Sequence, residues 1–127
     1  MSQIRKSTSR ATSFRHAFAG WWYVLRTQRN AWIHAIATLA VVALAIFLGI
    51  PWADWASLLL AIGMVWLAEF INSALEAIVD LASPELHPLA KVGKDVGAAA
   101  VLIAAGVAVL VGIVILGPAI LTRFLGT

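Results

Sequence analysis

The chain has 127 residues, of which 62% are hydrophobic and only 12% are charged. An ordinary soluble domain is about half apolar and about a quarter charged. This composition excludes a typical water-soluble domain and predicts that lipid surrounds much of the chain. Cysteine is absent, which excludes disulfides and thiolate metal sites.

The basic residues are concentrated in two segments. Six of the nine precede the first long apolar run and two lie between the second and third runs, namely Arg5, Lys6, Arg10, Arg15, Arg26 and Arg29, then Lys91 and Lys94. The positive-inside rule places these segments in the cytoplasm, with the first connection and the C-terminus outside. Anionic lipid headgroups explain the basic N-terminus, so nucleic acid is not an expected partner.

The N-terminal part of the chain predicts a surface helix. Residues 1–12 are polar and are expected to be disordered. Over residues 13–28 apolar positions recur at steps of three and four opposite basic ones, which predicts an amphipathic helix in the membrane interface. Three adjacent aromatic residues, Trp21 to Tyr23, suit the headgroup region.

Three apolar segments, at 31–50, 54–82 and 95–116, are long enough to cross a hydrocarbon layer of about 30 Å. Pro51, Ser83 with Pro84, and Gly117 with Pro118 are expected to end them. We therefore predict an all-α membrane protein with three transmembrane helices and a surface helix, forming one domain over residues 13–127. A strip of small residues on the third span favours close helix packing, at Ala100, Ala104, Ala108 and Gly112.

Polar residues in the second span form a stripe. At helical spacing they fall within roughly 90° of one face, and they are Glu69, Asn72, Ser73, Glu76 and Asp80. Ionisable groups inside a membrane span are costly, and they normally face a protein interior or an aqueous cavity. The stripe therefore predicts a functional site.

Clustered carboxylates in a medium of low dielectric must share protons or bind cations. Carboxylate and amide oxygens suit Mg²⁺, which commonly carries nucleotide phosphates. Lys91 and Lys94 follow the stripe, and a lysine beside a metal could stabilise a transferred phosphoryl group, although membrane anchoring also predicts lysines here. His34 is interpreted as an interfacial packing residue, and neither familiar phosphate-binding loop nor zinc-ligand spacing occurs.

The order of these residues resembles the prokaryotic diacylglycerol kinase and undecaprenol kinase family. The resemblance rests on Glu69-x-x-Asn72-Ser73-Ala74-x-Glu76-x-x-x-Asp80, on His87-x-x-Ala90-Lys91-x-x-Lys94-Asp95, and on Arg29-Asn30-x-x-Ile33-His34. It implies an ATP-dependent, Mg²⁺-requiring lipid kinase of the bacterial inner membrane. It further implies a homotrimer with shared active sites that face the cytoplasm.

The resemblance also implies roles for single residues. Glu69 would be the general base on the lipid hydroxyl, and Glu76 would hold the magnesium bound to ATP. Other positions would line the site or contact the nucleotide: Asn72, Asp80, Glu85, His87, Lys94 and Asp95. Gln28 departs from the pattern, because a glutamate is expected there as a second metal ligand, and its loss should weaken metal binding.

The acceptor lipid is open to more than one interpretation. The segment from Arg29 to His34 is more similar to the undecaprenol branch of the family, and diacylglycerol is the alternative acceptor. Two further alternatives are an inactive family member, because of Gln28, and a non-enzymatic membrane oligomer such as a transporter subunit, because acids inside spans also mark ion pathways.

Overall fold

Four helices make up nearly all of the described chain. The structure is a computed structural model that describes residues 9–85 and 87–126. Its helices are α1 (Arg10–Thr27), α2 (Arg29–Leu48), α3 (Trp52–Ala82) and α4 (Pro88–Leu125). Helices α2, α3 and α4 are each long and apolar enough to cross a membrane. The predicted all-α membrane fold is confirmed.

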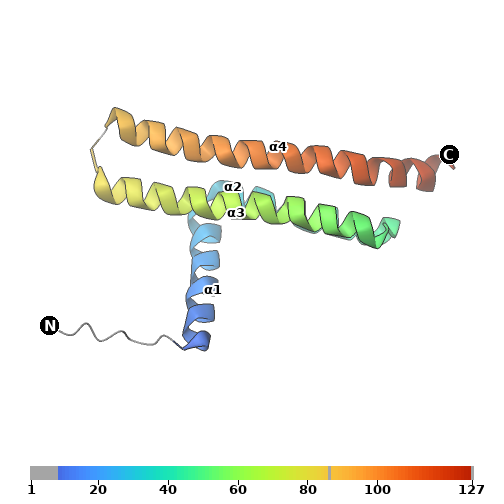
Figure 1. The fold of residues 1–127 in the computed structure, drawn as a ribbon, viewed down its shortest axis with the longest axis horizontal. Coiled ribbons are helices and arrows are strands. Elements are labelled where there is room, and N and C mark those ends of the chain that lie inside the picture. The colour runs from blue at the N-terminus through green and yellow to red at the C-terminus, as the bar shows by residue number, and fades with distance from the viewer. Residues whose placement is uncertain (1–8, 86, 127) are drawn as a thin grey trace.

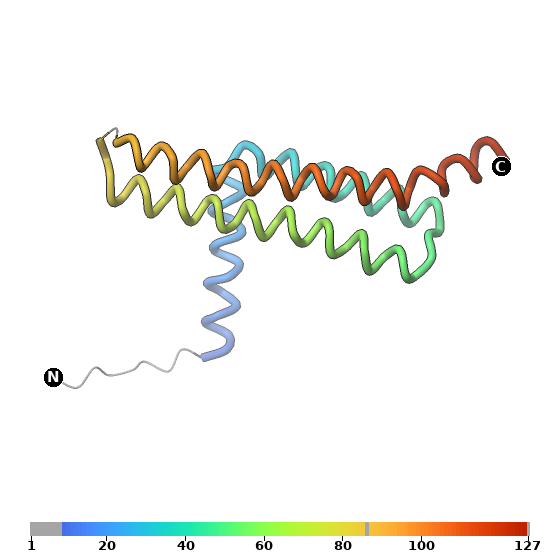
Figure 2. Tube along the Cα trace, turned by 45° about the horizontal axis from the view of Figure 1, so that its top comes forward, coloured from blue at the N-terminus to red at the C-terminus, as the bar shows by residue number. Residues whose placement is uncertain are grey.

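The three long helices lie alongside one another, and α1 runs crosswise to them (Figures 1 and 2). This is the arrangement that a surface helix beside spanning helices requires. The turn between α3 and α4 projects well past the junction of α1 and α2 (Figure 1). The ends of α3 and α4 therefore extend beyond the level that α1 marks.

Local hydrogen bonds set the boundaries of α1. The helix begins at Arg10, three residues before the predicted start, because Ser9 Oγ accepts a hydrogen bond from the Thr12 amide. At its other end Gln28 is extended (φ −103°, ψ 113°) and separates α1 from α2. Residues 1–8, where disorder is expected, lie outside the described residues.

The connections and ends of the spanning helices differ from the predicted boundaries. Gly49 ends α2 in the left-handed region at φ 65°, so that its amide reaches the carbonyl of Ala45. Helix α4 begins at Pro88, where His87 Nδ1 accepts from the Leu89 amide. It also continues through Pro118, where a break was expected. In lipid no water satisfies freed carbonyls, so continuing the helix costs less than ending it.

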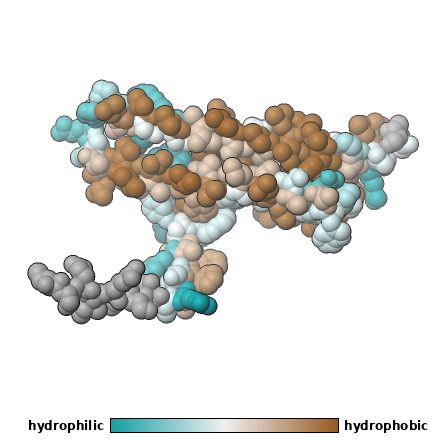
Figure 3. All heavy atoms as spheres, viewed as in Figure 1, coloured by the Kyte–Doolittle hydropathy of each residue, from teal (hydrophilic) through white to brown (hydrophobic). Residues whose placement is uncertain are grey.

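The apolar surface faces outward. A small buried core, formed by Ala45, Ile50, Leu58 and Leu116, joins the end of α2 to the first turns of α3 and the C-terminal half of α4, away from the α3–α4 turn. Most other large apolar side chains on the long helices are exposed, and hydrophobic residues dominate the visible face of the bundle (Figure 3). Hydrophilic residues gather at the α3–α4 turn. This pattern suits a bundle whose middle contacts lipid.

An aromatic cluster attaches α1 to α3. The ring centroid of Trp21 lies 4.7 Å from that of Trp66 and 4.8 Å from that of Phe70. Tilted and edge-on aromatic pairs of this kind stabilise packing beyond their buried area. The cluster fixes the surface helix beside the middle of α3.

We predict that Trp21→Ala loosens α1. It removes both ring contacts, so the free energy of unfolding should fall by about 2 kcal/mol, measured in mixed micelles of dodecyl maltoside and SDS. Trp22→Ala is the matched control, because Trp22 is 61% exposed and has no ring partner within the described ranges. Equal losses in both variants would contradict this docking role.

Candidate active site

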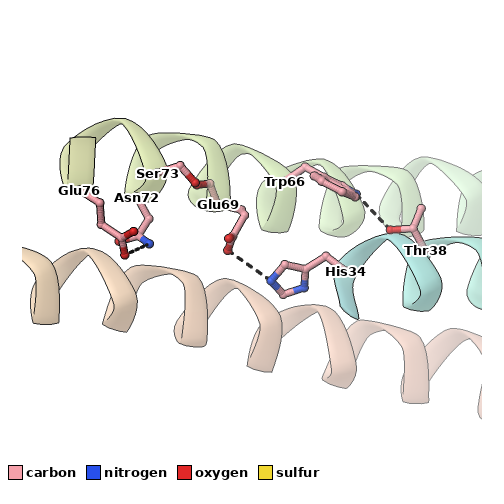
Figure 4. A network of polar contacts seen from close by, with 7 residues as sticks. All are labelled: His34, Thr38, Trp66, Glu69, Asn72, Ser73 and Glu76. Carbon is pink, nitrogen blue, oxygen red and sulfur yellow. Dashed lines mark hydrogen bonds and ion pairs between the residues drawn. The ribbon is translucent and has the colours of Figure 1, made fainter. Parts of the chain in front are cut away.

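A buried carboxylate lies at the centre of the polar stripe. Glu69 of α3 is 1% exposed and points toward His34 of α2 (Figure 4). The distance from His34 Nε2 to Glu69 Oε2 is 3.5 Å, and the His34 side chain is 14% exposed. Within the part of the chain that the structure describes, neither atom has a hydrogen-bond partner. His34 therefore faces the stripe, a contact that its interpretation as a packing residue missed.

Two amides hold the second carboxylate of the stripe. Asn72 Nδ2 donates to Glu76 Oε1 at 3.1 Å, and Gln28 Nε2 donates to Glu76 Oε2 at 2.9 Å. Ser73 bonds within its own helix, because its hydroxyl donates to the Glu69 carbonyl at 2.8 Å. The junction of α1 and α2 is thus joined to α3 through Glu76.

Helix α4 approaches α3 closely at Gly97. A Cβ at this position would lie 2.3 Å from Asn72 Oδ1, which is far inside van der Waals contact. Asn72 is 7% exposed, and its Oδ1 lacks a hydrogen-bond partner in the described structure. Only glycine therefore allows α4 to pack against Asn72 in this orientation.

The charged residues nearer the α3–α4 turn form ion pairs. Lys94 Nζ lies 2.6 Å from Asp80 Oδ1 and joins α4 to α3. Lys91 pairs with Asp95 within α4. All four side chains are at least 40% exposed, so the pairs contribute little to stability.

The remaining predicted site residues lie in the connection between α3 and α4. Glu85 is exposed, and its carbonyl accepts from Ser83 Oγ. His87 is also exposed and caps α4. Across the described residues, the structure gives neither side chain a polar contact with the stripe.

Polarity changes steadily along the site. Glu69 is buried beside apolar helices, Glu76 is half-buried, and the Asp80 side chain is 65% exposed. About 16 Å of helix separates the first acid from the last, at 1.5 Å per residue. Such a gradient suits a site that meets a lipid at one end and a charged, water-borne molecule at the other.

The residues around Glu76 fit a hard divalent cation. No group of three or more His, Cys, Asp or Glu side chains that could hold a metal occurs among the described residues. Mg²⁺ does not need such a group, because it commonly binds one or two carboxylates together with substrate phosphates. Glu76 provides one carboxylate, and the Asn72 amide that now donates to it could turn its oxygen toward a cation. Rotation of the Gln28 amide would add a third oxygen.

The fold and the site together define a helical membrane protein with a polar site at one end of its long helices. The family profile described as prokaryotic diacylglycerol kinase matches residues 15–116. The chain belongs to this family of membrane lipid kinases, and the resemblance inferred from its motifs is confirmed.

Relatives with assigned names support this membership. An undecaprenol kinase of Bacillus subtilis is 38% identical over 84% of this chain and 86% of its own length. A diacylglycerol kinase of Synechocystis is 43% identical over 87% of this chain, which spans 63% of that relative. A diacylglycerol kinase of Escherichia coli K12 is 36% identical over 74% of this chain and 83% of its own length.

We predict that Gly97→Ala disrupts the site. The new Cβ would force Asn72 to rotate or α4 to shift, so the hydrogen bond from Asn72 to Glu76 should break. We expect a loss of about 1–3 kcal/mol in the free energy of unfolding, as for overpacking of a core, together with reduced kinase activity. Unfolding in mixed micelles and phosphate transfer to lipid would measure these effects.

Gly93→Ala is the matched control, one turn earlier on α4. A Cβ there would meet Val79 Cγ2 at 3.8 Å, an ordinary contact. The double variant Gly97→Ala with Asn72→Ala should recover stability without recovering activity. Stability unchanged in Gly97→Ala would mean that the approach of α4 to Asn72 is not a constraint.

Proposed function

We propose that this lipid kinase transfers the γ-phosphoryl group of ATP to the hydroxyl of a membrane lipid alcohol, with undecaprenol as the favoured acceptor and diacylglycerol as the alternative. The observation that carries this proposal is the placement of Glu69. It is a buried carboxylate whose Oε2 has no hydrogen-bond partner among the described residues, at the apolar end of a stripe whose other end is exposed and charged. A lipid hydroxyl and a nucleotide would approach it from opposite ends.

Glu69 acts as the general base in the proposed reaction. Its Oε2 accepts the proton of the lipid hydroxyl as the hydroxyl oxygen attacks the γ-phosphorus. The bond between that phosphorus and the bridging β,γ-oxygen breaks, and the bridging oxygen leaves on ADP with the electron pair. The proton remains on Glu69 until the products depart.

The exposed end of the site suits the nucleotide. Lys94 is held by an aspartate in the structure, and a phosphate oxygen offers the same kind of partner with more charge. In the proposal Lys94 and Asp95 contact the nucleotide, and Glu85 and His87 of the connection cover it. Their exposure leaves them free to do so.

Magnesium would be held by Glu76, and by the amide oxygens of Gln28 and Asn72 once these amides, which now donate to Glu76, rotate. When bound, it would neutralise charge that develops on the phosphate oxygens. Gln28 provides no charge, so this site should bind the cation more weakly than one built from two carboxylates. The hydrogen bond from Gln28 to Glu76 competes with the cation as well.

The choice of acceptor rests on the start of α2. Identity alone does not separate the acceptors, because relatives of both names match the chain. His34 lies in the segment that resembles the undecaprenol branch, and its side chain reaches Glu69. This contact supports undecaprenol, because it puts a residue of that segment beside the proposed base.

We propose a homotrimer with shared sites in the bacterial inner membrane, with the N-terminus and site in the cytoplasm. The basic residues of the N-terminus and of the first two turns of α4 support this orientation. An open apolar groove of about 620 Å³ between α3 and α4 supports assembly. It reaches Asn72 and Gly97, so a neighbouring copy seated there would adjoin the site.

We predict that Glu69→Gln retains the fold and nucleotide binding but loses turnover. The amide keeps the shape of the side chain and cannot take the proton, so the rate should fall by on the order of 10²–10⁴-fold. The assay follows labelled phosphate from ATP into undecaprenol and diacylglycerol offered in parallel. Asp54→Asn, the same kind of change at the opposite end of α3, is the control.

Other results of this assay separate the alternatives. Nucleotide binding without turnover in the unmodified chain would identify an inactive family member. Turnover of neither lipid, accompanied by ion or lipid flux in vesicles, would favour a non-enzymatic membrane oligomer. Faster turnover of diacylglycerol than of undecaprenol would make diacylglycerol the acceptor.

We predict that Gln28→Glu lowers the magnesium concentration needed for turnover. A second carboxylate beside Glu76 attracts the cation. Without the cation the two carboxylates repel one another, and the hydrogen bond that the Gln28 amide donates to Glu76 is lost. The concentration for half-maximal rate should therefore fall several-fold, and magnesium should raise the unfolding midpoint more than in the unmodified chain. Magnesium titrations of activity and of thermal unfolding would measure both effects.

Thr27→Glu is the control for this substitution. It adds the same charge one residue earlier, where the side chain is exposed and its hydroxyl donates to the Tyr23 carbonyl of its own helix. A magnesium response in Gln28→Glu no stronger than in Thr27→Glu would remove Gln28 from the metal site.

A further inference from the structure

His34 and Glu69 face one another across the interface of α2 and α3 without completing a hydrogen bond. Their closest atoms, Nε2 and Oε2, are 3.5 Å apart, beyond the usual range for nitrogen and oxygen. Both atoms are buried, and neither has another partner among the described residues. Unsatisfied buried polar atoms are costly, particularly when one belongs to a carboxylate.

A single hydroxyl group can satisfy both atoms. An oxygen about 2.8 Å from each would complete a triangle with the 3.5 Å separation as its base. The hydroxyl would donate its proton to Glu69 Oε2 and accept a hydrogen bond from the Nε2–H of His34. An imidazole with its proton on Nε2 can donate whether or not the ring is charged.

Neighbouring side chains hold His34 in position for this role. The Trp66 ring lies edge-on to the imidazole, with centroids 6.4 Å apart. Trp66 Nε1 in turn donates to Thr38 Oγ1 at 3.1 Å, and Thr38 lies one turn after His34 on α2. The indole is therefore tied to the helix that carries His34, and Trp21 of α1 also packs against it.

An apolar groove leads from His34 along the bundle. It has a volume of about 590 Å³ and is lined by α2, α3 and α4 from His34 to Ile120. Its lining is apolar over nearly its whole length, with small residues such as Ala108 and Gly112 on the α4 side. A groove with polar groups at one end and apolar walls beyond matches a long-chain alcohol.

We propose that His34 binds the acceptor lipid together with Glu69, with the lipid hydroxyl bridging Nε2 and Oε2 and the apolar tail lying in the groove between α2, α3 and α4. The inference rests on the proposed lipid kinase function. One of the two lone pairs of the hydroxyl oxygen accepts from His34, which leaves the other free to attack phosphorus as Glu69 takes the proton. His34 thus orients the hydroxyl oxygen, while Glu69 removes the hydroxyl proton.

Two substitutions distinguish binding from packing. His34→Phe keeps a ring against Trp66 and removes the donor, whereas His34→Gln keeps an N–H donor and removes the ring. If His34 binds the hydroxyl, the phenylalanine variant should raise the KM for the lipid alcohol about tenfold, as for the loss of one hydrogen bond. The glutamine variant should recover most of that loss, and the KM for ATP should stay unchanged in both.

The opposite ranking would overturn the proposal. A normal lipid KM in His34→Phe, with a raised one in His34→Gln, would show that His34 only packs against Trp66. Equal changes in the KM values for lipid and ATP would likewise show a structural effect, and unfolding midpoints would identify a variant that no longer folds. If the unmodified chain phosphorylates neither lipid alcohol, the proposed function itself fails, which is a separate result.

Discussion

A carboxylate buried among apolar helices is the constraint on which the rest of the site depends. Glu69 is 1% exposed and lies on a helix whose other faces are largely apolar. Removing a charged group from water costs several kcal/mol unless neighbouring groups compensate for it. That compensation is incomplete here, because His34 of α2 lies opposite Glu69 at 3.5 Å without completing a hydrogen bond. The packing of α2 against α3 therefore determines the chemistry of the site as well as its stability.

Helical geometry distributes the stripe on α3 among three different neighbours. Glu69 faces α2, Asn72 packs against α4 at Gly97, and Glu76 receives an amide from the junction of α1 and α2. Each contact joins a different element to the same helix. Of these three contacts, a shift of α4 along its axis would consequently disturb only that at Asn72. A shift of α2 would disturb the contacts of both Glu69 and Glu76, because Gln28 immediately precedes α2.

The sequence was informative about α3 and much less so about its partners. The stripe follows from local periodicity, which one segment contains completely. The contacts of Glu69 with His34 and of Glu76 with Gln28 join residues 35 and 48 positions apart, and no periodicity within one helix predicts them. An ionisable histidine near the start of an apolar span was a signal of function in retrospect. The close approach at Gly97 and the continuation of α4 through Pro118 depend on packing and on lipid, which single residues do not reveal.

The two acids of the site meet their ligands under different conditions. Glu76 already accepts hydrogen bonds from two amides, so a cation that binds it must displace or rotate the amide of Gln28. Glu69 Oε2 has no such partner in the described structure, so a hydroxyl that binds there replaces nothing and satisfies two buried atoms. The glutamine lowers the cost of keeping Glu76 without a cation, and for the same reason it weakens the attraction for one. In the proposed enzyme, lipid binding is therefore favoured by two buried atoms that lack hydrogen bonds. Metal binding is disfavoured, because it must first break a hydrogen bond to Glu76.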